Sequence, residues 1–308
     1  MEGAIAVTHV PIQAYLDATL PNPFLAGKHR PLVVGHRGVP MLHQENTLAG
    51  FRRAVALGID AVELDVRVTR DHRAVVFHDS SLERLVGIRR SISELTWHEV
   101  ASLRVASTIR VGIDALGNPI VARYDGEARI PLLAEVLAEV AGRIAINIEL
   151  KSRWLGDAIG SIVAEEIATA GVADRVIVTS FDPRALRDVA RFDAAIALGY
   201  CWEESALGFA GLQGRRLLNR ALDTNLAGRV LGTRAVGANH TLVGPETVRR
   251  LHRHNVAIGA HVLFPIGSPS GRSIPETATS PAEVARLVEL GIDWIETDDP
   301  ERLQRLVA

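Results

Sequence analysis

The stretch LVVGHRGVPMLHQENTLAGF, residues 32–51, combines the signals of a strand, a polar turn and the start of a helix. Three aliphatic residues run into Gly-His-Arg-Gly, and a helical pattern, NTLAGFRRAVALG, begins at residue 46. A buried strand followed by a short polar loop and an amphipathic helix is the repeating unit of parallel α/β folds. The stretch therefore predicts a β/α unit whose loop carries a histidine and an arginine between two glycines.

The same alternation recurs along the rest of the chain. Helical patterns lie between most of the candidate strands, and several of these patterns begin at Pro, Asx, Ser or Thr and end at Gly. A (β/α)8 barrel commonly takes about 250 residues, so a chain of 308 residues suits a single barrel domain spanning residues 1–308. The eight predicted strands are residues 32–36, 61–66, 145–150, 175–181, 195–200, 234–240, 256–263 and 293–298.

One apolar run does not fit this alternation. AVVFHD, residues 74–79, follows the second strand after too few residues for a crossover helix. The pattern predicts a hairpin that turns at Arg70–Arg73, pairs Thr69 with Ala74 and places Asp65 opposite His78. We expect residues 80–130, which follow the strand of His78, to form a small inserted subdomain.

Composition narrows the classes of partner. The net charge of −2 offers no excess of one sign to neutralise a nucleic-acid backbone, so a small-molecule substrate is the better expectation. The only cysteine, Cys201, excludes an internal disulfide and fits a reducing compartment. The N-terminal region has no basic segment of a secretory signal, and no apolar run approaches the ~20 residues of a transmembrane helix. These features predict a soluble, cytoplasmic protein and do not define its oligomeric state.

Carboxylates gather at the predicted strand ends. Glu63 and Asp65 are two residues apart and share one face of their strand, as do Asn147, Glu149 and Lys151 on the next. Strand ends converge at the mouth of a parallel barrel, and an all-oxygen ligand set favours Mg²⁺ or Ca²⁺ over zinc. Lys151 is one of only two lysines among 34 basic residues, which indicates a need for a compact charge beside an anion.

His36 and His78 supply groups for proton transfer. Cleavage of a phosphodiester removes a proton from the attacking oxygen and returns one to the leaving alkoxide, and two imidazoles can share that work. Arg37 is suited to bind a phosphate oxygen, and Gly35 and Gly38 would leave room for close backbone approach.

With these residues assembled, the chain resembles the glycerophosphodiester phosphodiesterase family. Over about residues 32–302 it matches the HRG, ENT, E-x-D, HD and E-[IL]-K signatures of that family in order, and weaker SF and TD-P elements follow downstream. The matching residues are His36-Arg37-Gly38, Glu45-Asn46-Thr47, Glu63-Leu64-Asp65, His78-Asp79, Glu149-Leu150-Lys151, Ser180-Phe181 and Thr297-Asp298-Asp299-Pro300.

The resemblance implies a barrel with an inserted subdomain and one divalent cation on Glu63, Asp65 and Glu149. It also implies His36 and His78 as general acid and base in the hydrolysis of glycerophosphodiesters to glycerol 3-phosphate and an alcohol. Substrate contacts are expected from Arg37, Lys151, Glu45 and His261.

Two departures from the family pattern leave the substrate open. Gln44 stands where the family usually has a proline, and Gly259-Ala260-His261-Val262-Leu263 replaces a W-T-V-N pattern. Two alternatives therefore remain: a phosphodiesterase of lysophospholipid or sphingolipid headgroups, and a metal-dependent lyase or isomerase acting on a sugar phosphate. His240, like His261, ends a strand and is a candidate for the mouth.

Overall fold

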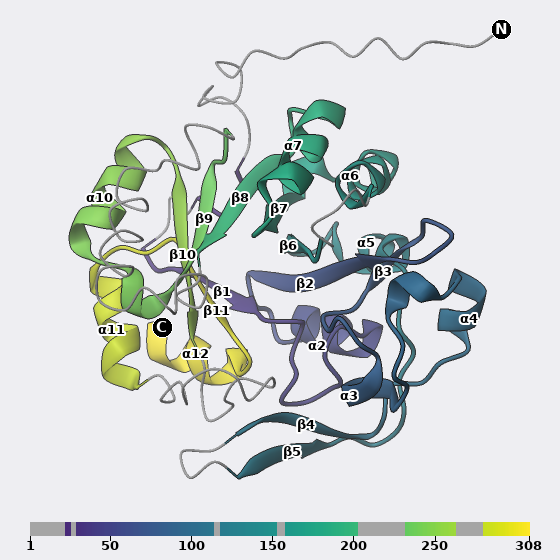
Figure 1. Cartoon of the computed structure of the whole chain (residues 1–308). Helices are drawn as coiled ribbons and strands as arrows, with labels where there is room; N and C mark the ends of the chain where they lie inside the picture. The colour runs from purple at the N-terminus through teal and green to yellow at the C-terminus, as the bar shows by residue number, and fades with distance from the viewer. Residues whose placement is uncertain (1–21, 26–28, 114–117, 153–157, 203–231, 263–279) are drawn as a thin grey trace, which may run out of the picture.

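The computed structural model describes residues 22–25, 29–113, 118–152, 158–202, 232–262 and 280–308, and its central feature is a closed barrel of parallel strands (Figure 1). β1 (Leu32–Gly35) pairs with both β2 (Ala61–Val68) and β11 (Trp294–Thr297), which closes the sheet. The predicted eight-stranded barrel is confirmed, and each predicted strand is present with its ends moved by at most two residues. The other barrel strands, in order, are β6 (Ala145–Leu150), β7 (Val176–Ser180), β8 (Ala197–Trp202), β9 (Ala235–Asn239) and β10 (Ala257–Val262).

Helices cover the outside of the barrel, as Figure 1 shows. Thr47 caps the first of them by accepting a hydrogen bond from the Gly50 amide at 3.3 Å, and Asp182 caps another by accepting from the Arg184 amide at 2.9 Å. None of the described helices is long and apolar enough to cross a membrane. The barrel helices are α2 (Leu48–Ala56), α5 (Leu133–Val140), α6 (Ile159–Ala170), α7 (Pro183–Phe192), α10 (Pro245–Arg253), α11 (Pro281–Glu289) and α12 (Pro300–Val307).

The inside of the barrel is apolar at the amino ends of the strands and charged at the carboxyl ends. Phe24 is buried in the apolar end and packs edge-on against Trp294, with ring centroids 5.4 Å apart. Side chains alternate along a strand, so positions two and four residues farther on also face inward. In this way the buried Ala61 of β2 is followed by Glu63 and Asp65, and Trp294 of β11 by Glu296 and Asp298.

The hairpin after β2 is present, but its predicted register is wrong by one residue. β3 (Ala74–Val76) pairs Val68 with Ala74, and the Phe77 amide bonds to the Asp65 carbonyl at 2.8 Å, so Phe77 and not His78 stands opposite Asp65. The cause is the turn: the Thr69 amide bonds to the Arg73 carbonyl, which leaves a three-residue loop closed by His72 at φ 59°. Position 78 therefore lies beyond the paired strand.

Between β3 and α5 the chain leaves the barrel and forms a segment with its own small core, which we call the inserted segment. Its core joins Leu82, Leu85, Ile92 and Ile109 to Phe77 of the hairpin. Figure 1 shows this segment beside the α2 and α5 side of the barrel. Its elements are α3 (Glu83–Val86), η1 (Ile92–Glu94), α4 (Trp97–Ala101), β4 (Thr108–Ile113) and β5 (Pro119–Arg123), and the two strands pair as an antiparallel ribbon.

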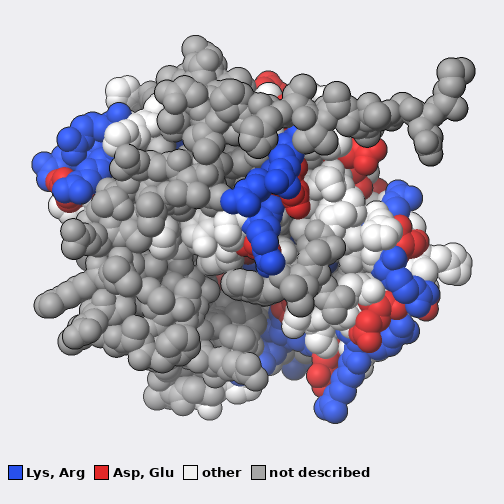
Figure 2. All heavy atoms as spheres, turned by 45° about the horizontal axis from the view of Figure 1, so that its top comes forward, with Lys and Arg blue, Asp and Glu red and all other residues white. Residues whose placement is uncertain are grey.

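Charged side chains of both signs adjoin one another on the described part of the face in Figure 2. On α10, for example, Glu246 pairs with Arg249 at 2.7 Å and with Arg250 at 2.5 Å. This mixing agrees with the small net charge of the chain.

The glycine at position 259 is predicted to be essential to the barrel interior. A Cβ added there would lie 1.7 Å from an indole carbon of the buried Trp294, whereas a Cβ at Gly237 would lie no closer than 3.8 Å to Cys201 Sγ. Gly259→Ala should lower the free energy of unfolding by about 2 kcal/mol or more, since overpacking a core costs roughly 1–3 kcal/mol. Gly237→Ala is the matched control, and equal losses in the two variants on urea denaturation would contradict the assignment.

A pH-dependent contribution to stability is predicted for His252 on α10. Its hydrogen bond of 2.8 Å to Asp293 raises the pKa of His252, so its stabilising effect is complete below the unfolded pKa of about 6.5 and disappears as the pH rises through the folded value. His252 is 37% exposed, and solvent screening keeps the effect below ~1 kcal/mol. Melting curves at pH 5.5 and 8.5 should show a smaller pH-dependent loss in His252→Gln than in the parent protein. His254→Gln, at an exposed position nearby, should behave like the parent.

Candidate active site

The loop after β1 makes a tight turn that positions His36 and Arg37. Arg37 adopts φ 55° and Gly38 φ 90°, and a Cβ at Gly35 would lie 2.2 Å from the Gly38 carbonyl oxygen. Glycine at these two positions therefore allows the backbone of the turn to come close to other backbone atoms. The turn also directs the Arg37 amide to Glu63 Oε2, which accepts its hydrogen bond at 2.9 Å.

Three carboxylates predicted as metal ligands come together at the barrel mouth. Glu63, Asp65 and Glu149 can each offer an oxygen so that all the offered atoms lie within 4.8 Å of one another. β2 and β6 pair in register, with Asp65 beside Glu149, which explains why residues 84 positions apart in the sequence meet. Glu63 Oε1 is buried and accepts no hydrogen bond among the described residues, so this cluster has an unsatisfied oxygen.

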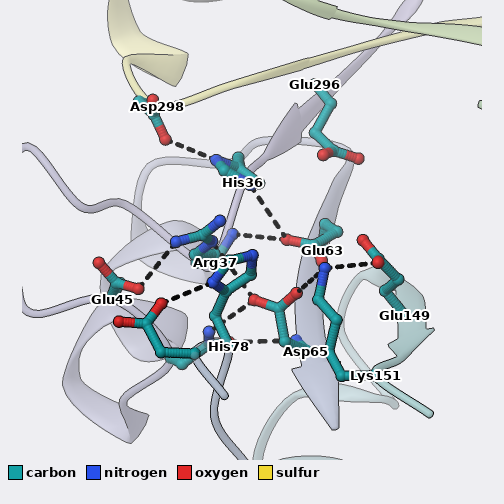
Figure 3. Close-up of polar contacts among 12 residues, drawn as sticks. His36, Arg37, Glu45, Glu63, Asp65, His78, Glu149, Lys151, Glu296 and Asp298 are labelled. Carbon is teal, nitrogen blue, oxygen red and sulfur yellow. Dashed lines mark hydrogen bonds and ion pairs between the residues drawn. The ribbon is translucent and has the colours of Figure 1, made fainter. Parts of the chain in front are cut away.

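Burial and mutual repulsion dominate the electrostatics of this cluster. Burial, with the charges of Asp65, Glu296 and Glu149, raises the pKa of Glu63 well above its usual range. Burial also opposes ionisation of Asp65, but the charge of Lys151, helped by His78 and Arg37, outweighs it and lowers the pKa of Asp65. Lys151 Nζ lies 3.0 Å from Asp65 Oδ1 and 2.5 Å from Glu149 Oε1, and Figure 3 shows the ammonium beside both carboxylates. The three carboxylates therefore need a nearby positive charge, and Lys151 supplies one.

Asp65 is held on its other side by the ENT segment. Asn46 donates its side-chain N–H to Asp65 Oδ2 at 2.8 Å and accepts from the Asp65 amide at 3.2 Å. Asn46 takes φ 58°, and its amide bonds to the Arg37 carbonyl. Asparagine tolerates this left-handed conformation better than most residues, so its place here has a backbone reason as well as a side-chain one.

His36 is oriented by a carboxylate from the last strand. Its Nδ1 lies 2.7 Å from Asp298 Oδ1, and its Nε2 lies 4.0 Å from Glu63 Oε2 (Figure 3). An ionised carboxylate only accepts hydrogen bonds, so Nδ1 carries the proton and Nε2 is left to exchange one. The ring of His261 lies edge-on to that of His36 with centroids 4.5 Å apart, and its Nδ1 is 3.3 Å from Glu296 Oε1.

His78 is also oriented by a carboxylate. Its Nδ1 lies 2.8 Å from Asp79 Oδ1, and its carbonyl accepts two hydrogen bonds from the Arg67 guanidinium at 2.9 Å and 2.6 Å. Burial, followed by the positive charges of Arg37 and Lys151, lowers the pKa of His78 to about 4. Those two cations reach His78 because it stands beside the carboxylates despite the shifted register of the hairpin.

Arg37 and Glu45 form a buried pair under the mouth. Arg37 donates to Glu45 Oε1 at 2.9 Å, and its Nε lies 3.3 Å from Asp65 Oδ2. Burial opposes the charge of both partners, but their attraction and that of Arg84 keep the pKa of Glu45 lowered. Both oxygens of Glu45 are taken by arginines, so its position suits holding Arg37 better than binding a substrate directly.

The structure thus brings all nine predicted site residues to one mouth and adds others that sequence reasoning missed. Asp298, Glu296, Asn46 and Arg84 contact predicted residues, and none of the four was among the predicted site residues. Glu296 and Asp298 have the same E-x-D spacing as Glu63 and Asp65, which was the available signal. His240 bonds instead to Glu283 of α11 at 2.9 Å, and Leu263 with its following loop lies outside the described residues.

Known proteins resemble this chain over most of its length. The model of the Glycerophosphoryl diester phosphodiesterase family matches residues 36–302. A glycerophosphodiester phosphodiesterase of Caldanaerobacter subterraneus is 29% identical over 280 residues, covering 90% of this chain and 98% of that protein. One from Bacillus altitudinis is 27% identical over 281 residues, covering 89% and 97%.

Solved structures share the fold. A putative glycerophosphoryl diester phosphodiesterase from Silicibacter pomeroyi aligns with a TM-score of 0.68 at 24% identity, over 95% of this chain and 96% of that one. An Oleispira antarctica phosphodiesterase in complex with its product sn-glycerol-3-phosphate aligns with a TM-score of 0.62 at 20% identity, over 90% and 96%. The family model spans nearly all of the barrel together with the site, and the chain belongs to the glycerophosphoryl diester phosphodiesterase family.

Proposed function

We propose that this protein hydrolyses glycerophosphodiesters to glycerol 3-phosphate and an alcohol, with His36 and His78 exchanging the protons. The observation that carries the proposal is the convergence of two carboxylate-oriented imidazoles on one cluster of three carboxylates, two of them buried. The family match supports the substrate class and does not favour a lyase or an isomerase. Activity on lysophospholipid or sphingolipid headgroups is left as an outcome of the assay.

The two histidines divide the proton transfers between them. One imidazole Nε2 removes the proton from the glycerol hydroxyl next to the phosphate as that oxygen attacks phosphorus, and the other protonates the alkoxide as the P–O bond to the alcohol breaks. Water then opens the cyclic phosphodiester with the roles reversed. Asp298 and Asp79 keep each ring in the tautomer with the proton on Nδ1, so that Nε2 takes part.

Positive side chains bind and orient the phosphate. Lys151 Nζ lies between Asp65 and Glu149, where its charge faces the cluster and any anion that approaches it. Arg37 is fixed from three directions by Glu45, Asp65 and its own amide bond to Glu63, so it is preorganised. We assign Glu45 to the positioning of Arg37, and His261 to contact with substrate beside His36.

The residues present fit one hard divalent cation. Glu63, Asp65 and Glu149 would hold it. The buried Glu63 Oε1, which has no hydrogen-bond partner in the described part of the chain, is an oxygen that such an ion would satisfy. The donor set is all oxygen, which suits Mg²⁺ or Ca²⁺. When bound, the ion would polarise a phosphoryl oxygen and lower the pKa of the attacking hydroxyl.

Removal of divalent cations should abolish the release of glycerol 3-phosphate from glycerophosphocholine, and addition of Mg²⁺ or Ca²⁺ should restore it. Glu63→Gln keeps the shape of the side chain but removes a charge, so calorimetry should show at least about a tenfold loss of cation affinity. Glu289→Gln, at an exposed position, is the control. Full activity after exhaustive chelation would refute the metal assignment.

His36→Ala and His78→Ala should each reduce kcat by roughly 10²- to 10⁴-fold because a general acid or base contributes about that much. A substrate whose leaving group is p-nitrophenol needs no general acid. The variant that recovers most of its activity on that substrate therefore lacks the acid, and the other lacks the base. His98→Ala, at an exposed position, should match the parent, and undiminished activity in both site variants would rule out this mechanism.

A further inference from the structure

Arg84 of the inserted segment uses all of its hydrogen-bond donors at the edge of the site. A guanidinium has five N–H groups in a fixed planar fork. Arg84 makes two bonds to Asp79, of 2.6 and 3.1 Å, two to Glu45, both of 2.7 Å, and one to the Arg110 carbonyl at 3.4 Å. Its side chain is only 15% exposed, and both carboxylates are more than three-quarters buried.

The two carboxylates bound by Arg84 each hold a residue assigned to the reaction. Asp79 accepts from Nδ1 of His78, and Glu45 accepts from the guanidinium of Arg37. Arg84 helps to neutralise both carboxylates. Against the effect of burial, the pKa of Asp79 is lowered by His78 and then by Arg84, and that of Glu45 by Arg37 and then by Arg84. Loss of Arg84 would free both carboxylates to move toward other cations.

The inserted segment fixes Arg84 and also grips the loop that carries Glu45. The neighbours Leu82 and Leu85 are buried in the core of the segment, and the Leu85 carbonyl accepts from the Ala106 amide at 2.9 Å. From the same segment, Tyr124 donates its hydroxyl to the Pro40 carbonyl at 2.7 Å. The Gln44 side chain donates to the Gly126 carbonyl, a bond that a proline at this position could not make.

We propose that Arg84 is a positioning residue that sets the geometry of His78 and Arg37 together, which makes the inserted segment part of the active site. The proposal rests on the proposed function for its consequence in catalysis. Lysine cannot replace this arginine, because a single ammonium cannot form two bidentate contacts in one plane.

Kinetic measurements on glycerophosphocholine test this role. Arg84→Lys and Arg84→Gln should each lower kcat by about 30-fold or more, since displacement of a catalytic group by about 1 Å can reduce rate by roughly 10²-fold. Guanidinium ion should restore at least about a tenth of the lost rate to Arg84→Gln by refilling the space between the carboxylates. Arg89→Ala, an exposed residue five positions away that pairs with Glu83, is the matched control and should be unaffected.

Coupling with Asp79 separates positioning from a general loss of stability. If Arg84 acts through Asp79, the loss in the double variant Arg84→Gln with Asp79→Asn should be clearly smaller than the product of the single losses. Independent, multiplicative losses, or an Arg84→Lys enzyme within about threefold of the parent in kcat, would overturn the proposal.

A spectroscopic measurement keeps the test independent of the reaction. In ¹⁵N-histidine spectra assigned with His78→Gln, the Nδ1 signal of His78 should shift in Arg84→Lys and stay in place in Arg89→Ala. A parent enzyme that does not cleave glycerophosphodiesters would refute the proposed function, while an unmoved His78 signal in Arg84→Lys would refute the positioning role.

Discussion

The structure depends on the way in which buried negative charge is neutralised at the carboxyl end of the barrel. Five carboxylates from β2, β6 and the end of β11 face this mouth. Glu63, Asp65 and Asp298 are almost completely buried, and the side chains of Glu149 and Glu296 are only 14% exposed. Like charges at such distances cannot all ionise without compensation. Arg37 and Lys151 supply part of it, and their raised pKa values express the same attraction from the cationic side.

The residues that compensate this charge are also the ones suited to a phosphodiester. Lys151 and Arg37 must stay cationic to stabilise the carboxylates, and a cation held in place is also a preorganised anion site. The hydrogen bonds of Asn46 and of the Arg37 amide fix Asp65 and Glu63 without adding charge. Glu63 Oε1 is also buried and has no hydrogen-bond partner among the described residues, so this oxygen is available to coordinate a hard cation.

The sequence was sufficient to predict the barrel and to place the main candidate site residues at its mouth, for physical reasons that are local. Period-two spacing places Glu63 and Asp65 on one face, and parallel register then sets them beside Glu149. The hairpin register was mispredicted because it depends on a left-handed residue, His72, that no hydrophobic pattern reveals. Arg84 was missed because its partners, Glu45 and Asp79, come together only when the inserted segment packs against the loop after β1, a contact with no sequence period.

A short sequence repeat occurs at β2 and at β11, the two strands that pair with β1. Gly-Ile-Asp followed by two residues and then E-x-D occurs at residues 58–65 and again at 291–298. The aspartates entering the two strands act alike: Asp60 accepts from the Val33 amide at 2.9 Å, and Asp293 accepts from the Ile258 amide at 2.7 Å. The repeat thus anchors each strand to a neighbour and delivers a Glu and an Asp to the mouth.

The two E-x-D pairs differ in what the adjacent strand brings to them. Beside β2, β6 contributes Glu149 and Lys151, so Asp65 becomes part of a crowded oxygen cluster that needs cations. Beside β11, β10 contributes His261, which lies near Glu296, while Asp298 is left to bond to His36. The same E-x-D spacing therefore supplies candidate ion ligands in one pair and the carboxylate that orients His36 in the other. The neighbouring strand, and not the motif itself, decides which role each pair takes.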